Sequence, residues 1–125
     1  MHPLNEEQTM MVEAARRFVR EQIIEPKLDM ALDRTAEFPH AIIRGLWEQG
    51  LQNLEFPAEV GGAGLSCHDH TLVIEEVNYG CLGIATSAVA NSLAALPLLL
   101  ADNEALRNEY LGRLTAAPGY AAYAC

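Results

Sequence analysis

Positive charge is scarce in this 125-residue sequence, which has 8 Lys and Arg against 17 Asp and Glu, for a formal net charge of −9. No lysine or arginine occurs between Arg44 and Arg107. Nucleic-acid binding depends on clustered cations that neutralise phosphates. The sequence therefore predicts that nucleic acid is not a partner.

Cysteine is also scarce, since only Cys67, Cys81 and Cys125 are present and no two of them form a C-x-x-C pair. An odd number without that spacing indicates neither a disulfide framework nor a zinc knuckle. The first residues show no basic segment followed by an apolar stretch, so no secretory signal is predicted. We expect free thiols in a reducing compartment, the cytoplasm or, in a eukaryote, the mitochondrial matrix.

Long uninterrupted apolar runs are missing as well. Residues 77–101 carry no charge, but polar residues recur among them, and the longest purely apolar stretch, Leu93–Ala101, has nine residues. A membrane-spanning helix needs roughly 20. We expect this region to form a buried helix and not a membrane span, because a bilayer would strand its polar groups.

Apolar residues recur at helical spacing along the chain, half of whose residues are hydrophobic, and the length fits one ordinary domain. Helix-start signals occur at Asn5, whose capping-box partner is Gln8, and at Ser66, whose partner is Asp69. The other expected helices run from Pro39 to Gly50, over Ile84–Leu100, from a cap at Asp102 to Pro118 and, briefly, from Pro26 through Ala31.

The expected fold is an all-α bundle of five to six helices that ends at the start of a β-strand. The strand is indicated by Tyr120–Cys125, which follow the helix-ending pair Pro118 and Gly119. Residues 51–65 contain a glycine-rich run and predict an ordered loop. The segment Ile84–Leu100 is apolar around most of its circumference, which is typical of a helix buried on several sides.

No catalytic or metal-binding group emerges from the residues themselves. The run 67–70, Cys-His-Asp-His, has four potential ligands, but positions i and i+2 of a helix do not face one another. The run 61–64, Gly-Gly-Ala-Gly, lacks the lysine of a phosphate loop and the spacing of a dinucleotide site. Glu75 and Glu76 point to different sides of a helix and indicate a solvated edge. We predict no catalytic residue and no metal site.

Four polar residues interrupt the apolar helix predicted over Ile84–Leu100, namely Thr86, Ser87, Asn91 and Ser92. Two interpretations remain open. In the first, these groups bond to backbone partners in a packed core. In the second, the small residues Ala85, Ala88 and Ala90 leave room beside the helix for the alkyl part of a lipid-like ligand.

Five motifs follow one another along residues 44–125: a tryptophan helix, a P-x-x-x-G-G-x-G-L loop, an E-E-x-x-x-G turn, an N-S-L helix and a Y-L-G-R-L segment. They lie in RGLWEQGLQNLEFPAEVGGAGLS at 44–66 and IEEVNYGCLGIATSAVANSLAALPLLLADNEALRNEYLGRLTAAPGYAAYAC at 74–125. In this combination the sequence resembles the acyl-CoA dehydrogenase family, most of all its medium-chain and short-chain branch.

The resemblance implies an N-terminal helical domain over 1–119 and the first residues of a middle β-domain over 120–125. Family members use bound FAD to take a proton and a hydride from the α and β carbons of a fatty or branched acyl-CoA. They pass the electrons to an electron-transfer flavoprotein and form homo-oligomers. Their catalytic glutamate lies in a C-terminal bundle, so no glutamate here inherits that role, and the chain by itself is expected to be inactive.

The resemblance also implies site residues. The positions that line the fatty-acyl pocket match Ala85, Thr86, Val89, Ala90 and Leu93. Tyr123 matches an aromatic residue beside the flavin, and Cys125 matches the next strand position near it. Medium-chain relatives often carry larger polar residues where Ala85 and Val89 stand, so a roomier and more apolar pocket is expected.

Two functions of other classes remain open. The chain is alternatively a stand-alone helical interaction module, a truncated or split relative that binds a partner chain and does no redox chemistry. A small acyl-carrier or lipid-binding module would require a pocket closed within these 125 residues.

Overall fold

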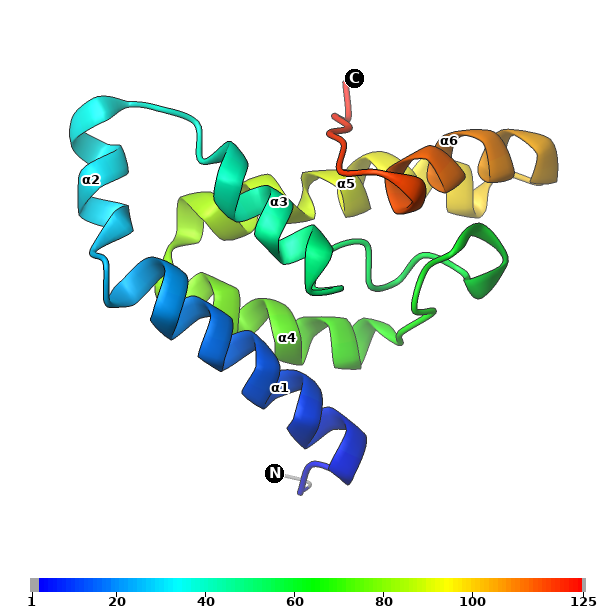
Figure 1. The fold of residues 1–125 in the computed structure, drawn as a ribbon. Coiled ribbons are helices and arrows are strands. Elements are labelled where there is room, and N and C mark those ends of the chain that lie inside the picture. Colours follow the sequence, from blue (N-terminus) through cyan, green and yellow to red (C-terminus); the bar gives the residue numbers. More distant parts are fainter. Residues whose placement is uncertain (1–2, 125) are drawn as a thin grey trace.

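Six α-helices make up the computed structural model, which describes residues 3–124 (Figure 1). In chain order they are α1 (Glu6–Val19), α2 (Leu28–Thr35), α3 (His40–Glu48), α4 (Cys67–Gly80), α5 (Leu82–Leu100) and α6 (Glu104–Ala116). A π-helical turn, η1 (Arg20–Ile24), continues α1, and a 3-10 turn, η2 (Ala58–Val60), interrupts the loop after α3. The expected all-α bundle is confirmed.

The helices pack around two apolar clusters. Helices α1 and α4 lie side by side, and α3 crosses the first half of α5, while α6 lies beside its second half (Figure 1). The larger cluster joins α1, α3, α4 and the start of α5, with Val19, Ile23 and Val77 at its centre. The smaller cluster joins α5 and α6 to the loop through Ala95 and Leu111.

The close approach of α1 and α4 depends on a glycine at the end of α4. A Cβ atom added to Gly80 would lie 2.4 Å from Cγ1 of Val19, so a larger residue would force the helices apart. On the outer side of the same pair, the Arg16 guanidinium donates to both carboxylate oxygens of Glu76, at 3.0 and 2.6 Å. This helix pair is therefore joined by shape in the core and by a bidentate ion pair at the surface.

The loop at 51–65 is ordered, as predicted, but its first half is part of the core. Leu51, Leu54 and Phe56 are buried, and Phe56 is fully enclosed by the smaller cluster. Gly62 packs against the Phe56 backbone so closely that a Cβ atom would lie 1.9 Å from the Phe56 carbonyl oxygen. Gly61 has a φ of 83°, which favours glycine. The glycine run thus folds the loop back onto its own buried segment.

Helix α5 is buried on one side and not on several, which corrects the expectation. Its buried residues lie on one face, whereas Leu82, Leu93 and Leu100 on the opposite face are 68%, 57% and 78% exposed. With 19 residues and a mean hydropathy of 1.6, α5 has the length and composition of a membrane-crossing helix, with 28% of its apolar window buried. Helices that pack inside a multi-helix fold share this length and composition, so the resemblance to a span is weak.

Two other expectations at the C-terminal end are wrong. The cap of α6 is Asn103 and not Asp102, because the Asn103 side chain accepts a hydrogen bond from the backbone N–H of Leu106 at 3.0 Å. Residues 120–124 form no strand, since a strand requires a partner and no other strand lies within residues 3–124. Cys125 lies outside the described residues.

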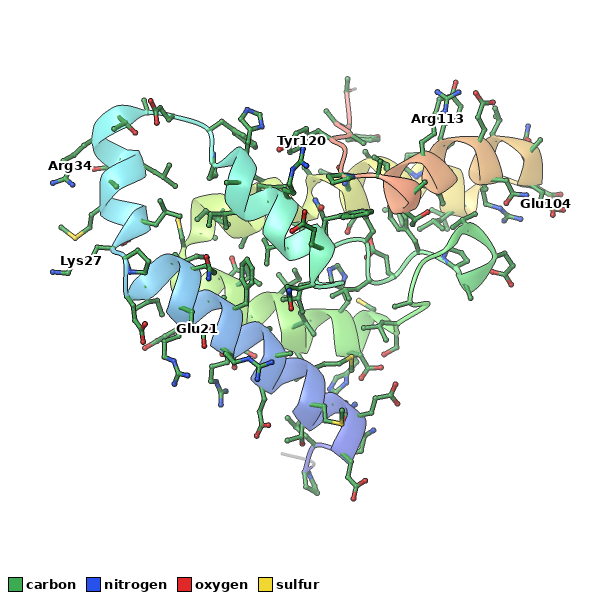
Figure 2. The ribbon with its side chains drawn as sticks, viewed as in Figure 1. Glu21, Lys27, Arg34, Glu104, Arg113 and Tyr120 are labelled. Atoms are coloured by element: carbon green, nitrogen blue, oxygen red, sulfur yellow. The ribbon has the colours of Figure 1, made fainter. Side chains whose placement is uncertain are left out.

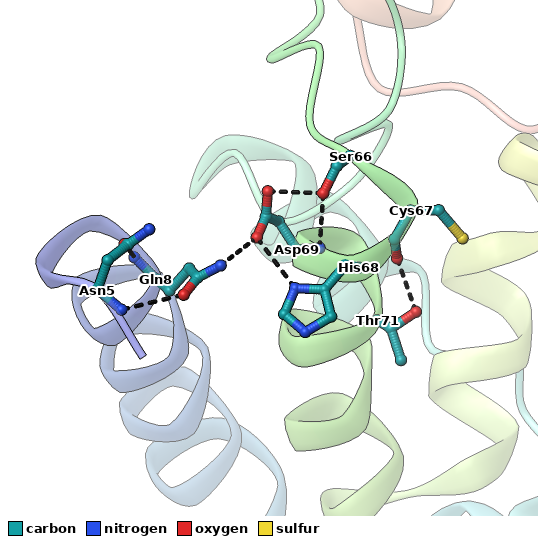
Figure 3. A network of polar contacts seen from close by, with 7 residues as sticks. All are labelled: Asn5, Gln8, Ser66, Cys67, His68, Asp69 and Thr71. Atoms are coloured by element: carbon teal, nitrogen blue, oxygen red, sulfur yellow. Dashed lines mark hydrogen bonds and ion pairs between the residues drawn. The ribbon is translucent and has the colours of Figure 1, made fainter. Parts of the chain in front are cut away.

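A chain of hydrogen bonds links the N-termini of α1 and α4 (Figure 3). The predicted capping box is present, since the Gln8 backbone donates to Asn5 Oδ1 at 2.8 Å and the Asn5 backbone donates to Gln8 Oε1 at 3.0 Å. The Gln8 side-chain amide then donates to Asp69 Oδ1 at 2.7 Å. The Ser66 hydroxyl donates to Asp69 Oδ2 at 2.7 Å and accepts from the Asp69 backbone. Each cap therefore supports the other.

These hydrogen bonds give folding a predictable acid dependence. The Gln8 amide and then the Ser66 hydroxyl hold the pKa of the Asp69 carboxyl below its usual value. Such a carboxylate stabilises the fold above its unfolded pKa, about 3.9, and the contribution is lost as pH falls through the lower folded pKa. We predict that Asp69→Asn lowers the urea midpoint at pH 7 and flattens its decline between about pH 5 and pH 2.

Urea unfolding followed by circular dichroism across this pH range measures both effects. The matched control is Glu75→Gln, which neutralises an exposed carboxylate on the same helix. Parallel pH profiles for Asp69→Asn and the unmodified chain would contradict the prediction.

Candidate functional site

The exposed face of α5 is a continuous apolar surface, here called the α5 stripe. Its members recur at intervals of three and four residues and thus share one side of the helix: Leu82, Thr86, Val89, Leu93, Leu96 and Leu100. The helix carries no ionisable side chain. The Thr86 hydroxyl donates to the Leu82 carbonyl of the preceding turn at 2.8 Å, so even this polar group is internally bonded.

A hollow of about 490 Å³ lies beside the first half of the stripe. It is bounded by α5, by the start of α3 and by the segment 117–124 after α6, and its lining residues are Phe38, His40, Thr86, Ser87, Ala90, Tyr120 and Ala121. The Ser87 hydroxyl donates to the Gly83 carbonyl at 2.9 Å, in the same way as Thr86 donates to Leu82. The hydroxyl protons on the helix side of the hollow are therefore already used in hydrogen bonds. This wall suits an apolar group.

The opposite wall is aromatic. The rings of Phe38 and Tyr120 meet edge to face with their centroids 5.5 Å apart, and the centroids of the Phe38 and His40 rings are 4.7 Å apart. Nδ1 of His40 is 2.9 Å from the Tyr120 hydroxyl. Figure 2 shows Tyr120 projecting from the last segment of the chain toward the start of α3. Two segments separated by 80 positions in the sequence are joined here by one side-chain hydrogen bond.

Asn91 anchors the segment that carries Tyr120. The side chain is 1% exposed, and its amide donates to Asn53 Oδ1 and to the Gly119 carbonyl, both at 3.1 Å. Its oxygen accepts from the backbone N–H of Ala121 at 2.7 Å. These bonds tie the backbone of 119–121 to a buried side chain of α5.

The structure places the predicted pocket residues on two sides of α5. Thr86 and Ala90 line the hollow, and Val89 and Leu93 lie along the stripe, half-buried and exposed respectively. Ala85 instead belongs to the larger core cluster with 1% exposure. Four of the five positions therefore face the same surface.

The predicted cofactor residues are less enclosed. Tyr123 is 52% exposed near the end of the described chain. Cys125 lies outside the described residues.

Sequence reasoning missed the aromatic wall and the partner of Asn91. Phe38 and His40 flank a helix-starting proline, and nothing in the local sequence indicates that they contact Tyr120, which lies far along the chain. Asn53 is in the left-handed conformation with a φ of 58°, which asparagine tolerates better than most residues. The polar residues inside the apolar helix were the one available signal, and for Asn91 they pointed to a satisfied core group.

Within residues 3–124, no group of three or more potential ligands is close enough to hold a metal. The run 67–70 contributes instead to the cap of α4 through Asp69. His70 approaches Glu55 of the buried loop, with Nδ1 3.6 Å from Oε2. Both Glu55 oxygens are buried and make no hydrogen bond with the described residues. This isolated pair has no third ligand and no neighbouring nucleophile among the groups described above.

Known proteins share this architecture. A chain at 37% identity, the probable medium-chain specific acyl-CoA dehydrogenase 2, mitochondrial, of Caenorhabditis briggsae, matches 96% of this chain and 29% of its own length. The 3-(aryl)acrylate reductase of Clostridium sporogenes is 35% identical over 84% of this chain and 28% of its own length. This chain thus spans about three tenths of the relatives it matches.

Solved structures agree on the fold. A chain from a study of the electron transferring flavoprotein of Acidaminococcus fermentans and flavin-based electron bifurcation superposes with a TM-score of 0.84, at 26% identity, over 96% of this chain and 31% of its own. A nitroalkane oxidase structure, at 19% identity and a TM-score of 0.77, shares the fold over 96% of this chain and 29% of its own.

The family model for the N-terminal domain of acyl-CoA dehydrogenase matches residues 5–117, which include all six helices. The helix order, the loop packed by its glycine run and the apolar face of α5 all lie within that match. This chain therefore belongs to the acyl-CoA dehydrogenase family and comprises its N-terminal helical domain.

Proposed function

We propose that this chain provides one wall of the acyl pocket of an FAD-dependent acyl-CoA dehydrogenase. The observation that supports this role is the hollow beside Thr86 and Ala90, which opens onto an uncharged helix face. Each methylene that moves from water onto such a face gains about 0.8 kcal/mol. An alkyl chain is the ligand that benefits most, because the helix wall offers it neither charge nor unpaired polar groups.

In this proposal, the groups that carry out the dehydrogenation of the acyl-CoA lie outside this domain. When bound, FAD accepts the hydride removed from the acyl β carbon. Tyr123, which the resemblance places beside the flavin, is 52% exposed, and the segment 117–124 contains no lysine or arginine for the phosphates of FAD. We propose that residues 120–125 lead into a middle β-domain that supplies the remaining contacts.

The partners and the compartment follow from the same proposal. We propose an acyl-CoA substrate, an electron-transfer flavoprotein as electron acceptor and a homo-oligomeric complete enzyme. We also propose that the protein works in the cytoplasm or, in a eukaryote, in the mitochondrial matrix. Fractionation of cells that express the native protein, followed by immunodetection, tests the compartment, and recovery in a secreted fraction would contradict it.

The first prediction concerns the flavin. Purified as this chain alone, the protein is expected to contain no FAD, because most contacts to the flavin and its pyrophosphate come from outside it. A visible absorption spectrum after gel filtration measures this, with a complete relative as the positive control. A stoichiometric flavin band would show that this domain holds the cofactor unaided.

The second prediction concerns the length of the acyl chain. In the complete flavoenzyme, Val89→Phe is expected to lower kcat/KM for long acyl-CoAs about tenfold relative to short ones, because the larger ring fills the pocket. Leu100→Phe, at the far end of the same stripe, is the matched control and is expected to keep the original ratio.

Assays of kcat/KM with saturated acyl-CoAs of increasing length give the ratio. An equal loss at every length for Val89→Phe would indicate general overpacking and would contradict the role of this helix as a pocket wall.

The third prediction separates this proposal from the alternative of a stand-alone interaction module. Contiguous exposed apolar patches usually mark an interface, and the α5 stripe runs the length of its helix. The isolated chain is expected to self-associate and to bind a hydrophobic dye, and Leu93→Lys with Leu100→Lys is expected to reduce both. Sedimentation velocity over a concentration series measures association. A compact monomer that does not bind the dye would favour the stand-alone module.

A further inference from the structure

Asn91 is the one fully buried polar side chain on an otherwise apolar helix face, at 1% exposure. Its amide nitrogen has two donors, and both are used, one by Asn53 and one by Gly119. Its oxygen accepts from Ala121 at 2.7 Å. A buried amide is costly when any of its partners is lost, so this side chain and its partners are mutually fixed.

The two backbone partners of Asn91 flank Tyr120. The carbonyl of the residue before Tyr120 and the N–H of the residue after it are both bonded to the same side-chain amide. Adjacent strands in a parallel sheet use this pair of groups on one strand to bond one residue of the next. The Asn91 side chain therefore takes the place of a neighbouring strand for a single residue.

This arrangement fixes where the Tyr120 ring lies. With its backbone held on both sides, Tyr120 directs its hydroxyl to within 2.9 Å of His40 Nδ1, and its ring meets that of Phe38 in an edge-to-face arrangement. Those three rings form the wall of the hollow opposite Thr86 and Ala90. The position of this wall thus depends on a side chain that does not itself line the hollow.

We propose that Asn91 is a positioning residue for the acyl pocket: it holds the segment 119–121 so that Tyr120 and His40 form the wall facing α5. The inference rests on the proposed function of the hollow. Asn91 sets the width of the hollow before a ligand arrives, and the substrate does not have to order this wall on binding.

Three variants of the chain test the proposal. Asn91→Leu removes all three hydrogen bonds. Asn91→Asp keeps an acceptor for the Ala121 N–H but loses both donors and places a carboxylate against two carbonyl oxygens. Ser92→Ala is the matched control on the next residue. Far-ultraviolet circular dichroism first establishes that each variant keeps its helices.

The first readout requires no ligand. Amide hydrogen exchange at Ala121 is expected to be about tenfold faster or more in Asn91→Leu than in the unmodified chain and in Ser92→Ala, because one buried hydrogen bond is lost. The contact between the His40 and Tyr120 rings, observed by nuclear Overhauser effects, is expected to weaken in both Asn91 variants. Unchanged exchange at Ala121 in a folded Asn91→Leu variant would overturn the positioning role.

The second readout uses octanoyl-CoA as the probe. It is added to the complete flavoenzyme, in which the other walls of the pocket are present, and titration is expected to shift the methyl resonances of Thr86 and Ala90 and the ring resonances of Tyr120. In Asn91→Leu the affinity is expected to fall about tenfold, and Tyr120→Leu, which removes the ring but leaves the Asn91 bonds, is expected to weaken binding comparably.

The outcomes separate the two proposals. Absence of any shift in the complete flavoenzyme would overturn the acyl-pocket function of the hollow, and with it this use of Asn91, even if exchange at Ala121 responds. Binding that is unchanged in both Asn91→Leu and Tyr120→Leu would leave the hollow as a ligand site and overturn the positioning role. Should Asn91→Leu fail to fold, Asn91→Asp and Tyr120→Leu decide the same question.

Discussion

The contact between two buried amides, Asn53 and Asn91, joins parts of the chain that apolar packing alone would leave independent. Asn53 belongs to the loop after α3, and its amide also donates to the Leu114 carbonyl of α6 at 3.0 Å. The Trp47 indole donates to that same carbonyl at 2.9 Å. Since Asn91 also bonds 119–121, α3, α5, α6 and the last segment meet at one hydrogen-bonded junction. A shift of any one element would leave a buried polar group unpaired.

The other half of the molecule is held together by a different means. Between α1 and α4 the decisive feature is the absence of a side chain at Gly80, which lets Val19 reach the opposite backbone. Close packing of this kind tolerates little change in side-chain volume. Hydrogen bonding at the amide junction instead fixes direction. The domain therefore combines a tightly packed helix pair, α1 and α4, with a hydrogen-bonded junction around Asn53 and Asn91. The hollow lies beside the segment that this junction holds.

The sequence predicted what is local and missed what is distant. The caps at Asn5 and Ser66 were predicted correctly because each involves residues three positions apart. The prediction of Asp102 as the cap of α6 was wrong because the next residue, Asn103, is also of a capping type and only the helix register decides between them. Likewise, nothing local distinguishes a solvated loop from one whose Phe56 is buried against α6. The wall formed by His40 and Tyr120 was not predicted for the same reason, since these residues meet only after folding. Thr86 and Ala90 were expected beside a pocket from the resemblance to the family.

The lack of ionisable side chains on α5 has a consequence for how the hollow responds to its surroundings. The helix wall keeps the same charge, zero, from strongly acidic to strongly alkaline solution. Salt concentration likewise has little to act on there, since screening requires charges to screen. The affinity of this helix face for an apolar group therefore changes little with pH or salt concentration. The two polar rings that line the hollow, those of His40 and Tyr120, lie together on the facing wall.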